Sequence, residues 1–153
     1  MPPCGDLQQY TVTDLVITLG AWVRAHPDFV LGSNEAGMRL RGSTRAADAA
    51  IWRRADIGAP QGGLQRVAPL LAAEVAGDEE EPEPLLRDKA RWYLDCGVQI
   101  VWILLPDVRE LLVITARGET RLRTGDRVLE DPLLPGLAPT VAELFTQVST
   151  WSS

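Results

Sequence analysis

The sequence predicts an α/β protein of mixed α+β type, in which a mixed β-sheet is flanked by helices. Two nearly continuous apolar runs, residues 67–76 and 99–105, are typical of strands that are buried on both faces. A segment with helical periodicity, residues 85–96, separates the two runs. Shorter strand candidates precede and follow this unit, and a helical segment comes before all of them, so the order of elements favours one sheet covered by helices.

The N-terminal helix is expected to begin at Thr13, which can cap it, and to end near Pro27. Strands are then expected at residues 29–31, 37–40 and 46–53. The tetrad 41–44 (Arg-Gly-Ser-Thr) has the composition of a turn between the second and third strands. Glycine and proline make residues 56–66 a loop.

The central helix is bracketed by Pro84 and Gly97, which suit the first and last turns of a helix. An acidic loop, residues 77–84, comes before it. Later elements are expected at 110–116 and 120–123 (strands) and around 141–145 (a short helix). We therefore expect one domain over residues 13–147, with an N-terminal tail (1–12) and a C-terminal tail (148–153).

Composition narrows the class of protein. A chain of 153 residues with 46% hydrophobic and 24% charged residues is typical of a soluble globular domain. The net charge of −6 argues against broad affinity for nucleic acid, although a local basic cleft is compatible with it. The longest apolar stretch is too short to cross a bilayer, and the N-terminus has no secretory pattern, so we expect a cytoplasmic protein. Two cysteines are too few for a disulfide framework or a thiolate metal site.

Lys89 is the only lysine in the chain. With helical periodicity it falls on the same stripe as Leu85, Trp92, Tyr93 and Cys96, which we expect to face the core. A cation in that position costs several kcal/mol unless it has a partner. The alternative is that the long side chain carries its amine to the edge of the helix.

Two carboxylates lie in segments that are also expected to be buried. Alternation along the strand puts Asp48 on the same face as Ala50 and Trp52. Glu74 lies in a strand whose other residues are all apolar. An ionised carboxylate there needs compensation, and a divalent cation provides it. Either acid can instead be a structural hydrogen-bond acceptor.

Oxygen donors favour Mg²⁺ or Mn²⁺ as that cation. Asp48 and Glu74 would bind it, the backbone carbonyl of Val75 could add a ligand, and Lys89 could orient a water molecule and offset negative charge on a phosphate.

The sequence resembles the PD-(D/E)XK superfamily, and within it a bacterial family of restriction-endonuclease-like proteins. The matching elements, in order, are Ala47-Asp48, Ala73-Glu74-Val75, Lys89 through Tyr93, Gly97-Val98, the strand 101–106, Leu134-Pro135-Gly136 and Leu144-Phe145. They cover roughly residues 13–147. The resemblance implies a restriction-endonuclease-like fold and metal-dependent hydrolysis of phosphodiester bonds in nucleic acid. It also implies that Asp48 and Glu74 bind the metal and that Lys89 is the superfamily's lysine, moved from the strand onto the following helix.

The chain departs from the family pattern in three places. Ala47 replaces the proline before Asp48, and an acidic loop replaces a serine-rich, often basic segment after Val75. The N-terminal segment, which often carries a further acid, looks shortened, and Asp14 is a candidate substitute. Five acids beside the site would repel a polyanion unless the loop moves away or is screened.

Two hypotheses follow. The first is a Mg²⁺- or Mn²⁺-dependent endonuclease with DNA as the expected substrate, in which Asp48, Glu74 and Lys89 are catalytic. The second is a catalytically silent binding or assembly module, in which the same three residues form a buried ionic network.

Further arginines can contact phosphates or simply keep strand edges soluble: Arg53, Arg54, Arg121, Arg123 and Arg127. The segment 133–137 can pack under the last helix or meet a second subunit in a homodimer.

Overall fold

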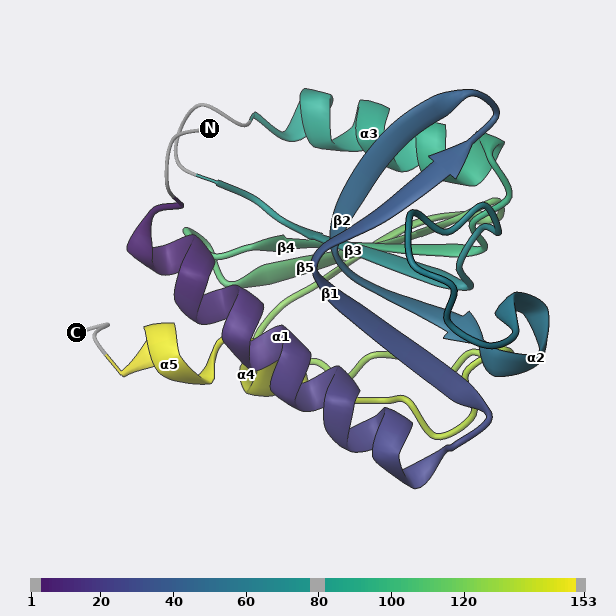
Figure 1. Ribbon diagram of the computed structural model, residues 1–153. Coiled ribbons are helices and arrows are strands. Elements are labelled where there is room, and N and C mark those ends of the chain that lie inside the picture. Colours follow the sequence, from purple (N-terminus) through teal and green to yellow (C-terminus); the bar gives the residue numbers. More distant parts are fainter. Residues whose placement is uncertain (1–3, 78–81, 151–153) are drawn as a thin grey trace.

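The fold is a six-stranded mixed β-sheet with helices on both faces (Figure 1). The computed structural model describes residues 4–77 and 82–150. Its elements are α1 (Asp6–Ala25), β1 (Phe29–Leu40), β2 (Ser43–Arg53), α2 (Arg54–Ile57), β3 (Leu71–Val75), α3 (Glu83–Asp95), β4 (Ile100–Leu105), β5 (Glu110–Thr115), β6 (Gly118–Leu122), α4 (Val141–Leu144) and α5 (Thr146–Ser149). The strands follow one another across the sheet in chain order. This architecture confirms the predicted mixed sheet flanked by helices.

The centre of the sheet is formed by β3 and β4, which pair in parallel, whereas the other neighbouring strands pair antiparallel. Every residue of both central strands is buried, as their apolar composition predicts. β3 is shorter than the predicted run 67–76, because only residues 71–75 pair as a strand. Since two parallel strands need a crossover, α3 connects them and runs back across one face of the sheet.

β1 and β2 form a long hairpin that bends over α3 (Figure 1). Arg41 and Gly42 at its tip have φ angles of 49° and 78°, as a two-residue hairpin turn requires. The expected turn 41–44 is therefore shorter than predicted, because its last two residues already pair as strand. The separate strands expected at 29–31 and 37–40 are one strand, interrupted by a register shift.

α1 begins at Asp6, so the predicted helix start at Thr13 is wrong. Residues 6–12, expected in a tail, are helical, and Thr11 among them is buried. Thr13 lies inside the helix, where its hydroxyl donates a 3.1 Å hydrogen bond to the carbonyl of Gln9. The helix start could not be predicted from a capping side chain, because the N-cap residue is Gly5, which has none.

α3 confirms the predicted helix and part of its predicted inner stripe, since Tyr93 is buried and Trp92 and Cys96 pack against the core. The buried residues are Leu86, Ala90 and Tyr93, whereas Leu85 is 54% exposed. Lys89 is half-buried. The helix is rotated relative to the expectation, so Lys89 lies at the edge of the buried face.

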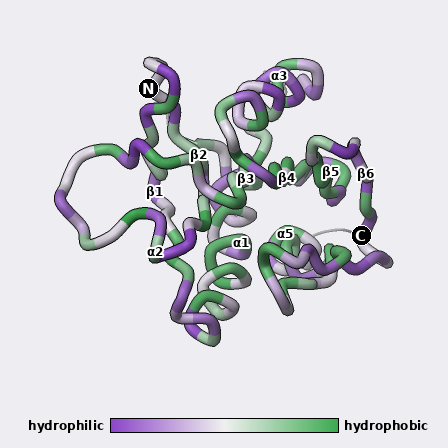
Figure 2. Tube along the Cα trace, turned by 90° about the vertical axis from the view of Figure 1, so that its right-hand side faces the viewer, coloured by the Kyte–Doolittle hydropathy of each residue, from purple (hydrophilic) through white to green (hydrophobic). Residues whose placement is uncertain are grey.

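Two apolar cores occupy the two sides of the sheet. α1 and α4 enclose one, and α3 with the hairpin encloses the other. Figure 2 shows the strands passing between α3 on one side and α1 with α5 on the other.

The C-terminal part of the chain closes the α1 side. Leu134 and Leu137 are buried there, and Trp22 donates a 3.0 Å hydrogen bond to the carbonyl of Pro135. The segment 133–137 therefore packs within its own chain. Val148, expected in the C-terminal tail, is buried in α5. Among the described helices, none has the length and apolar character needed to cross a bilayer.

Candidate active site

The two predicted carboxylates lie on the same side of the sheet. β2 and β3 pair Ala50 with Ala72 and Ala49 with Ala73, and one further step in this register sets Asp48 opposite Glu74. Residues directly opposite in an antiparallel pair point to the same face. Ala50 and Ala72 pack in the core on the α3 side, so both acids project toward α3.

Asp48 is half-buried and is fixed by the backbone of the next strand. Its Oδ2 accepts a 2.7 Å hydrogen bond from the amide of Val75. On its other side, the pairing of β1 with β2 skips from Ser33 to Ala36, so two residues of β1 stand opposite this one acid. Those two, Asn34 and Glu35, have φ angles of 58° and 60°.

This β-bulge breaks the regular ladder beside the acid. Bulges of this kind are frequent next to active sites, where they redirect a side chain. A left-handed conformation at a residue other than glycine costs about 1–2 kcal/mol. The β1–β2 hairpin therefore keeps a costly distortion at the position of Asp48.

Glu74 is 7% exposed and receives a short hydrogen bond from α3. The hydroxyl of Tyr93 donates to its Oε1 at 2.6 Å. Burial raises the pKa of Tyr93, and the negative charges of Glu74 and Asp48 raise it further, whereas Arg45 opposes the shift. Tyr93 is therefore a permanent donor at neutral pH, and both acids act on it electrostatically.

Tyr93 is a candidate site residue that was expected only as part of an apolar stripe. Its spacing of four from Lys89 was visible in the sequence, but the acceptor of its hydroxyl was not. A buried tyrosine hydroxyl usually requires such an acceptor. The need of a buried tyrosine hydroxyl for an acceptor was therefore the feature of the sequence that could have indicated a role for Tyr93.

The carbonyl of Val75, the third expected metal ligand, accepts a 3.1 Å hydrogen bond from Nε2 of Gln8. Gln8 belongs to the first turns of α1, which the sequence analysis assigned to a tail. A carbonyl oxygen can accept at two lone pairs, so this contact is compatible with a second ligand role. α1, β2, β3 and α3 thus all contribute polar groups at the end of β3.

Lys89 is half-buried on α3, one helical turn before Tyr93. Because α3 runs back along the parallel strands it connects, this turn lies toward the end of β3, where Glu74 and Val75 are.

Asp14 lies away from this cluster, so its suggested role as a substitute acid is wrong. It is buried at 6% exposure on the α1 side, where its Oδ2 accepts a 2.9 Å hydrogen bond from the amide of Gln147. Burial raises its pKa, and the amide of Gln147 partly offsets the shift. Asp14 therefore joins α1 to α5.

The donors at the end of β3 fit a hard divalent cation. Within residues 4–77 and 82–150, no group of three or more His, Cys, Asp and Glu side chains is placed to hold a metal. Two carboxylates and a carbonyl are nevertheless typical of Mg²⁺, which retains several water ligands and needs few protein ligands. Asp48, Glu74 and Val75 could provide this set.

A mixed sheet that bears two facing acids, followed by a helix with a half-buried lysine, is the arrangement expected of a restriction-endonuclease-like protein of the PD-(D/E)XK superfamily. The chain belongs to the Uma2 family, described as “Putative restriction endonuclease”, which matches residues 1–143.

Among solved structures, the fold is similar to that of a “putative nuclease belonging to DUF820” from Anabaena variabilis. The two share 13% sequence identity with a TM-score of 0.82, over 95% of this chain and 83% of the other. No protein of curated function matches the sequence.

Proposed function

We propose that this protein is a metal-dependent endonuclease that hydrolyses phosphodiester bonds in nucleic acid, with DNA as the expected substrate. Membership of the Uma2 family and the nuclease-like fold support a nuclease-like role. The observation that carries the proposal further is the pair of acids, Asp48 and Glu74, on neighbouring strands beside the β-bulge of β1.

In the proposed mechanism, Asp48 and Glu74 hold Mg²⁺ or Mn²⁺ together with the carbonyl of Val75. The ion, when bound, supplies positive charge for a phosphoryl oxygen and makes water a better nucleophile. Lys89 orients the attacking water or offsets charge that develops on the phosphate. Tyr93 holds Glu74 in place through the 2.6 Å hydrogen bond.

The acidic segment before α3 is partly compensated by arginine. Residues 78–81 lie outside the described part of the chain, but Glu83 is described. Its Oε2 contacts Arg121 at 2.7 Å and Arg87 at 3.0 Å. These two arginines lower its pKa and neutralise its charge, so Glu83 adds little repulsion toward a polyanion.

A nuclease panel tests the proposal. Single-stranded, duplex and branched DNA and RNA are incubated with the wild type and with Glu74→Gln, in Mg²⁺ or Mn²⁺. We expect metal-dependent cleavage by the wild type that Glu74→Gln lacks. Equal cleavage by both proteins would assign the activity to a contaminant, and no cleavage of any substrate would favour the catalytically silent module.

Lys89→Arg separates charge from geometry at the same site. It keeps the positive charge but replaces a compact ammonium with a larger planar group. We expect it to lose most turnover, and unchanged turnover would remove Lys89 from the mechanism.

A further inference from the structure

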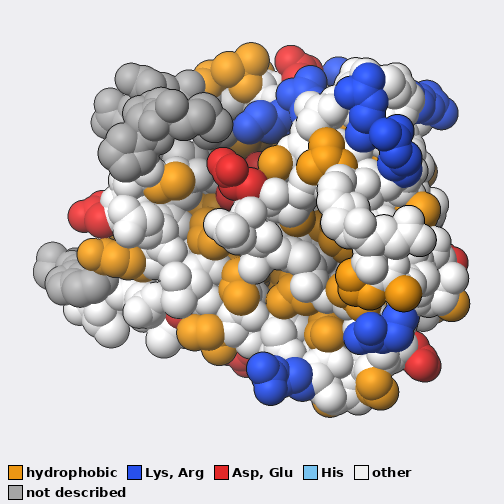
Figure 3. Space-filling view, in the orientation of Figure 1, with side chains coloured by type: hydrophobic (Ala, Val, Ile, Leu, Met, Phe, Trp, Pro, Cys, Tyr) orange, Lys and Arg blue, Asp and Glu red, His pale blue; other side chains and the backbone are white. Residues whose placement is uncertain are grey.

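The tip of the β1–β2 hairpin and the neighbouring segment at Arg66 carry arginines that are not matched by acids. Within the described residues, four exposed arginines here form no ion pair: Arg39, Arg41, Arg45 and Arg66. We call them the hairpin arginines. Lys and Arg side chains gather in this region, at the upper right of Figure 3. The chain as a whole has a net charge of −6, so this is a local reversal of sign.

The arginines named from the sequence as possible phosphate contacts already have partners. Arg54 and Arg127 donate to the backbone carbonyls of Pro27 and Ala138, and the other three contact acids. Arg121 and Arg123 contact Glu110 at 2.7 and 3.1 Å, and Arg53 contacts Asp56 at 3.3 Å. A phosphate would have to displace these carboxylates. The hairpin arginines require no such exchange.

The hairpin presents its arginines on a packed support. Met38 and Leu40 are buried at 0% and 5% exposure, and Arg39 between them is exposed. The Arg39 side chain also donates a 3.0 Å hydrogen bond to the hydroxyl of Thr44 on β2. Alternation along β1 therefore directs apolar groups inward and this arginine outward.

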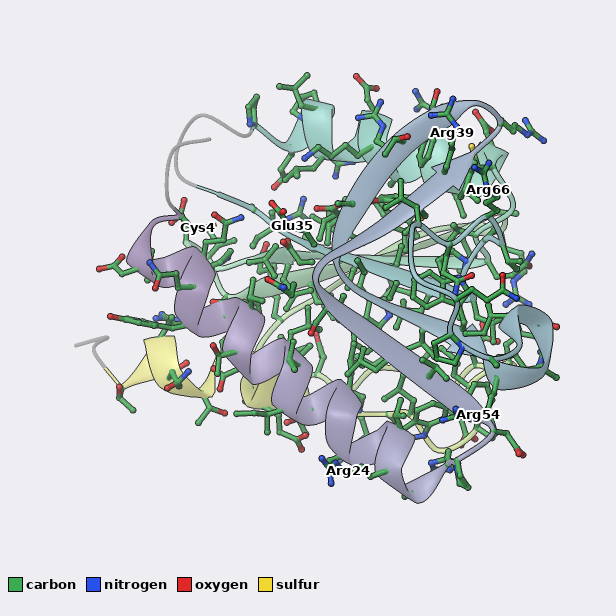
Figure 4. The ribbon with its side chains drawn as sticks, in the orientation of Figure 1. Cys4, Arg24, Glu35, Arg39, Arg54 and Arg66 are labelled. Atoms are coloured by element: carbon green, nitrogen blue, oxygen red, sulfur yellow. The ribbon has the colours of Figure 1, made fainter. Side chains whose placement is uncertain are left out.

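A second segment fixes Arg66 beside the hairpin. The amide of Arg39 donates to the carbonyl of Gln65 at 2.8 Å, and the amide of Gln65 donates to the carbonyl of Gly37 at 3.3 Å. A Cβ at Gly37 would lie 2.5 Å from the end of the Leu64 side chain, so a larger residue there would displace that side chain. Figure 4 shows Arg39 and Arg66 near one another at the tip of the hairpin.

Arg45 connects this surface to the candidate active site. Its guanidinium lies over the ring of Trp92 on α3, 5.1 Å from the ring centroid, and its charge acts on the pKa of Tyr93. Arg45 is separated from Asp48 by three steps along β2, or about 10 Å at 3.3 Å per residue. That separation is about three phosphate steps of 3.4 Å along a nucleic-acid strand.

We propose that the hairpin arginines bind the phosphate backbone of nucleic acid and guide a strand toward Asp48 and Glu74. This inference rests on the proposed nuclease function and adds the surface that holds the substrate. Backbone contacts by arginine are electrostatic and independent of base sequence. They also account for substrate capture by a chain whose net charge would otherwise repel a polyanion.

The test compares two double variants that remove the same charge from opposite ends of the molecule. Arg39→Ala/Arg66→Ala changes the hairpin, and Arg24→Ala/Arg54→Ala is the matched control at the lower edge of Figure 4. Binding of a short fluorescent DNA, single-stranded or duplex, is measured by anisotropy over a series of salt concentrations. EDTA is present, so the result does not depend on metal binding or cleavage.

We expect the hairpin double variant to lose about 1.4–1.8 units of the slope of log K against log salt, which is about 25- to 60-fold in affinity at 0.1 M salt. The control should follow the wild type, and thermal melts should show that both variants are folded. Equal losses in both variants would attribute binding to net charge. A hairpin variant that binds DNA as the wild type does, or a wild type that binds neither probe, would also overturn the inference. Metal binding by Asp48 and Glu74 is tested separately, because this assay is run in EDTA.

Discussion

A buried hydrogen bond joins Tyr93 of α3 to Glu74 near the end of β3. Glu74 is 7% exposed, and the Tyr93 hydroxyl that donates to it is also buried. A hydrogen bond to a charged group contributes about 1.5–3 kcal/mol. The raised pKa of Tyr93 ensures that the donor keeps its proton at neutral pH.

Tyr93→Phe should therefore destabilise the fold by about 1.5–3 kcal/mol, because it removes the donor and preserves the ring. Urea unfolding of Tyr93→Phe, Glu74→Ala and the double variant forms a cycle that isolates the coupling between the two side chains, because each single variant removes the hydrogen bond. A coupling energy near zero would show that the 2.6 Å contact does not hold Glu74.

For single residues, the orientation of two side chains of the candidate site could be predicted from the sequence. Alternation along β2 and β3 correctly placed Asp48 and Glu74 on faces that turn inward. It could not reveal that Tyr93 binds Glu74, because that contact depends on the rotation of α3. Gln8 was missed for another reason, since nothing in its neighbourhood signalled that α1 begins at Asp6.

The first turn of α3 is tied to the edge of the sheet by a network of charged side chains. Arg87 contacts Glu83 and Glu119 at 3.0 and 2.9 Å, and Arg121 contacts Glu83 and Glu110 at 2.7 Å each. The same helix carries Lys89 and Tyr93, so the network fixes the element that faces the two acids. The side chains of Arg87, Glu83 and Arg121 are about a third exposed, so solvent screening limits the stability that each ion pair contributes.

Arg121→Ala should destabilise the protein by about 1 kcal/mol at neutral pH, whereas Arg117→Ala on the same hairpin, whose side chain is 84% exposed, should change little. Arg121, through its hydrogen bond, is the largest cause that lowers the pKa of Glu83. A lowered carboxyl pKa gives stability that is present above the ordinary value of 4.5 and lost as the pH falls through the lowered value.

Urea midpoints at pH 7 and pH 3 check this prediction. The difference between the wild type and Arg121→Ala should shrink in acid. A difference that is independent of pH would mean that the arginine acts through packing and not through charge.

Across the described molecule, α1 joins the N-terminal part of the fold to its C-terminal helices. It packs against α4 and α5, and the buried carboxylate of Asp14 accepts a 2.9 Å hydrogen bond from the amide of Gln147. α1 also reaches the candidate site through Gln8. One helix therefore links the C-terminal closure of the fold to the end of β3.

Asp14→Asn tests this closure. Burial raises the pKa of Asp14 above its ordinary value of 3.8, so the folded state binds a proton more tightly than the unfolded state does. Keeping Asp14 ionised therefore costs stability as the pH rises above that value. The asparagine retains an acceptor for Gln147 without the charge, so the stability of the variant relative to the wild type should increase from pH 4 to pH 7.

The exposed Asp107→Asn serves as the control for that measurement, and its stability should follow the wild type at both pH values. If Asp14→Asn showed no change with pH, the charge of Asp14 would not be penalised by burial. Chemical unfolding monitored by tryptophan fluorescence provides the measurement.

The overall architecture was predictable because strands buried on both faces have continuous apolar sequences. β3 and β4, with α3 between them, were recognised for that reason. The bulge at Asn34 and Glu35 was not, because Asn is also common in ordinary turns and Glu35 gives no local sign of a left-handed conformation. Pairing between strands distant in sequence, such as β2 with β3, likewise depends on tertiary packing.

The central claim is that Asp48 and Glu74 form a site for a divalent cation. Titration calorimetry with Mn²⁺ on the wild type, Asp48→Asn, Glu74→Gln and the control Asp107→Asn tests it most directly. We expect one ion per chain in the wild type and the control, and an affinity at least about tenfold lower in each of the two site variants. Equal affinity in all four proteins would contradict the account.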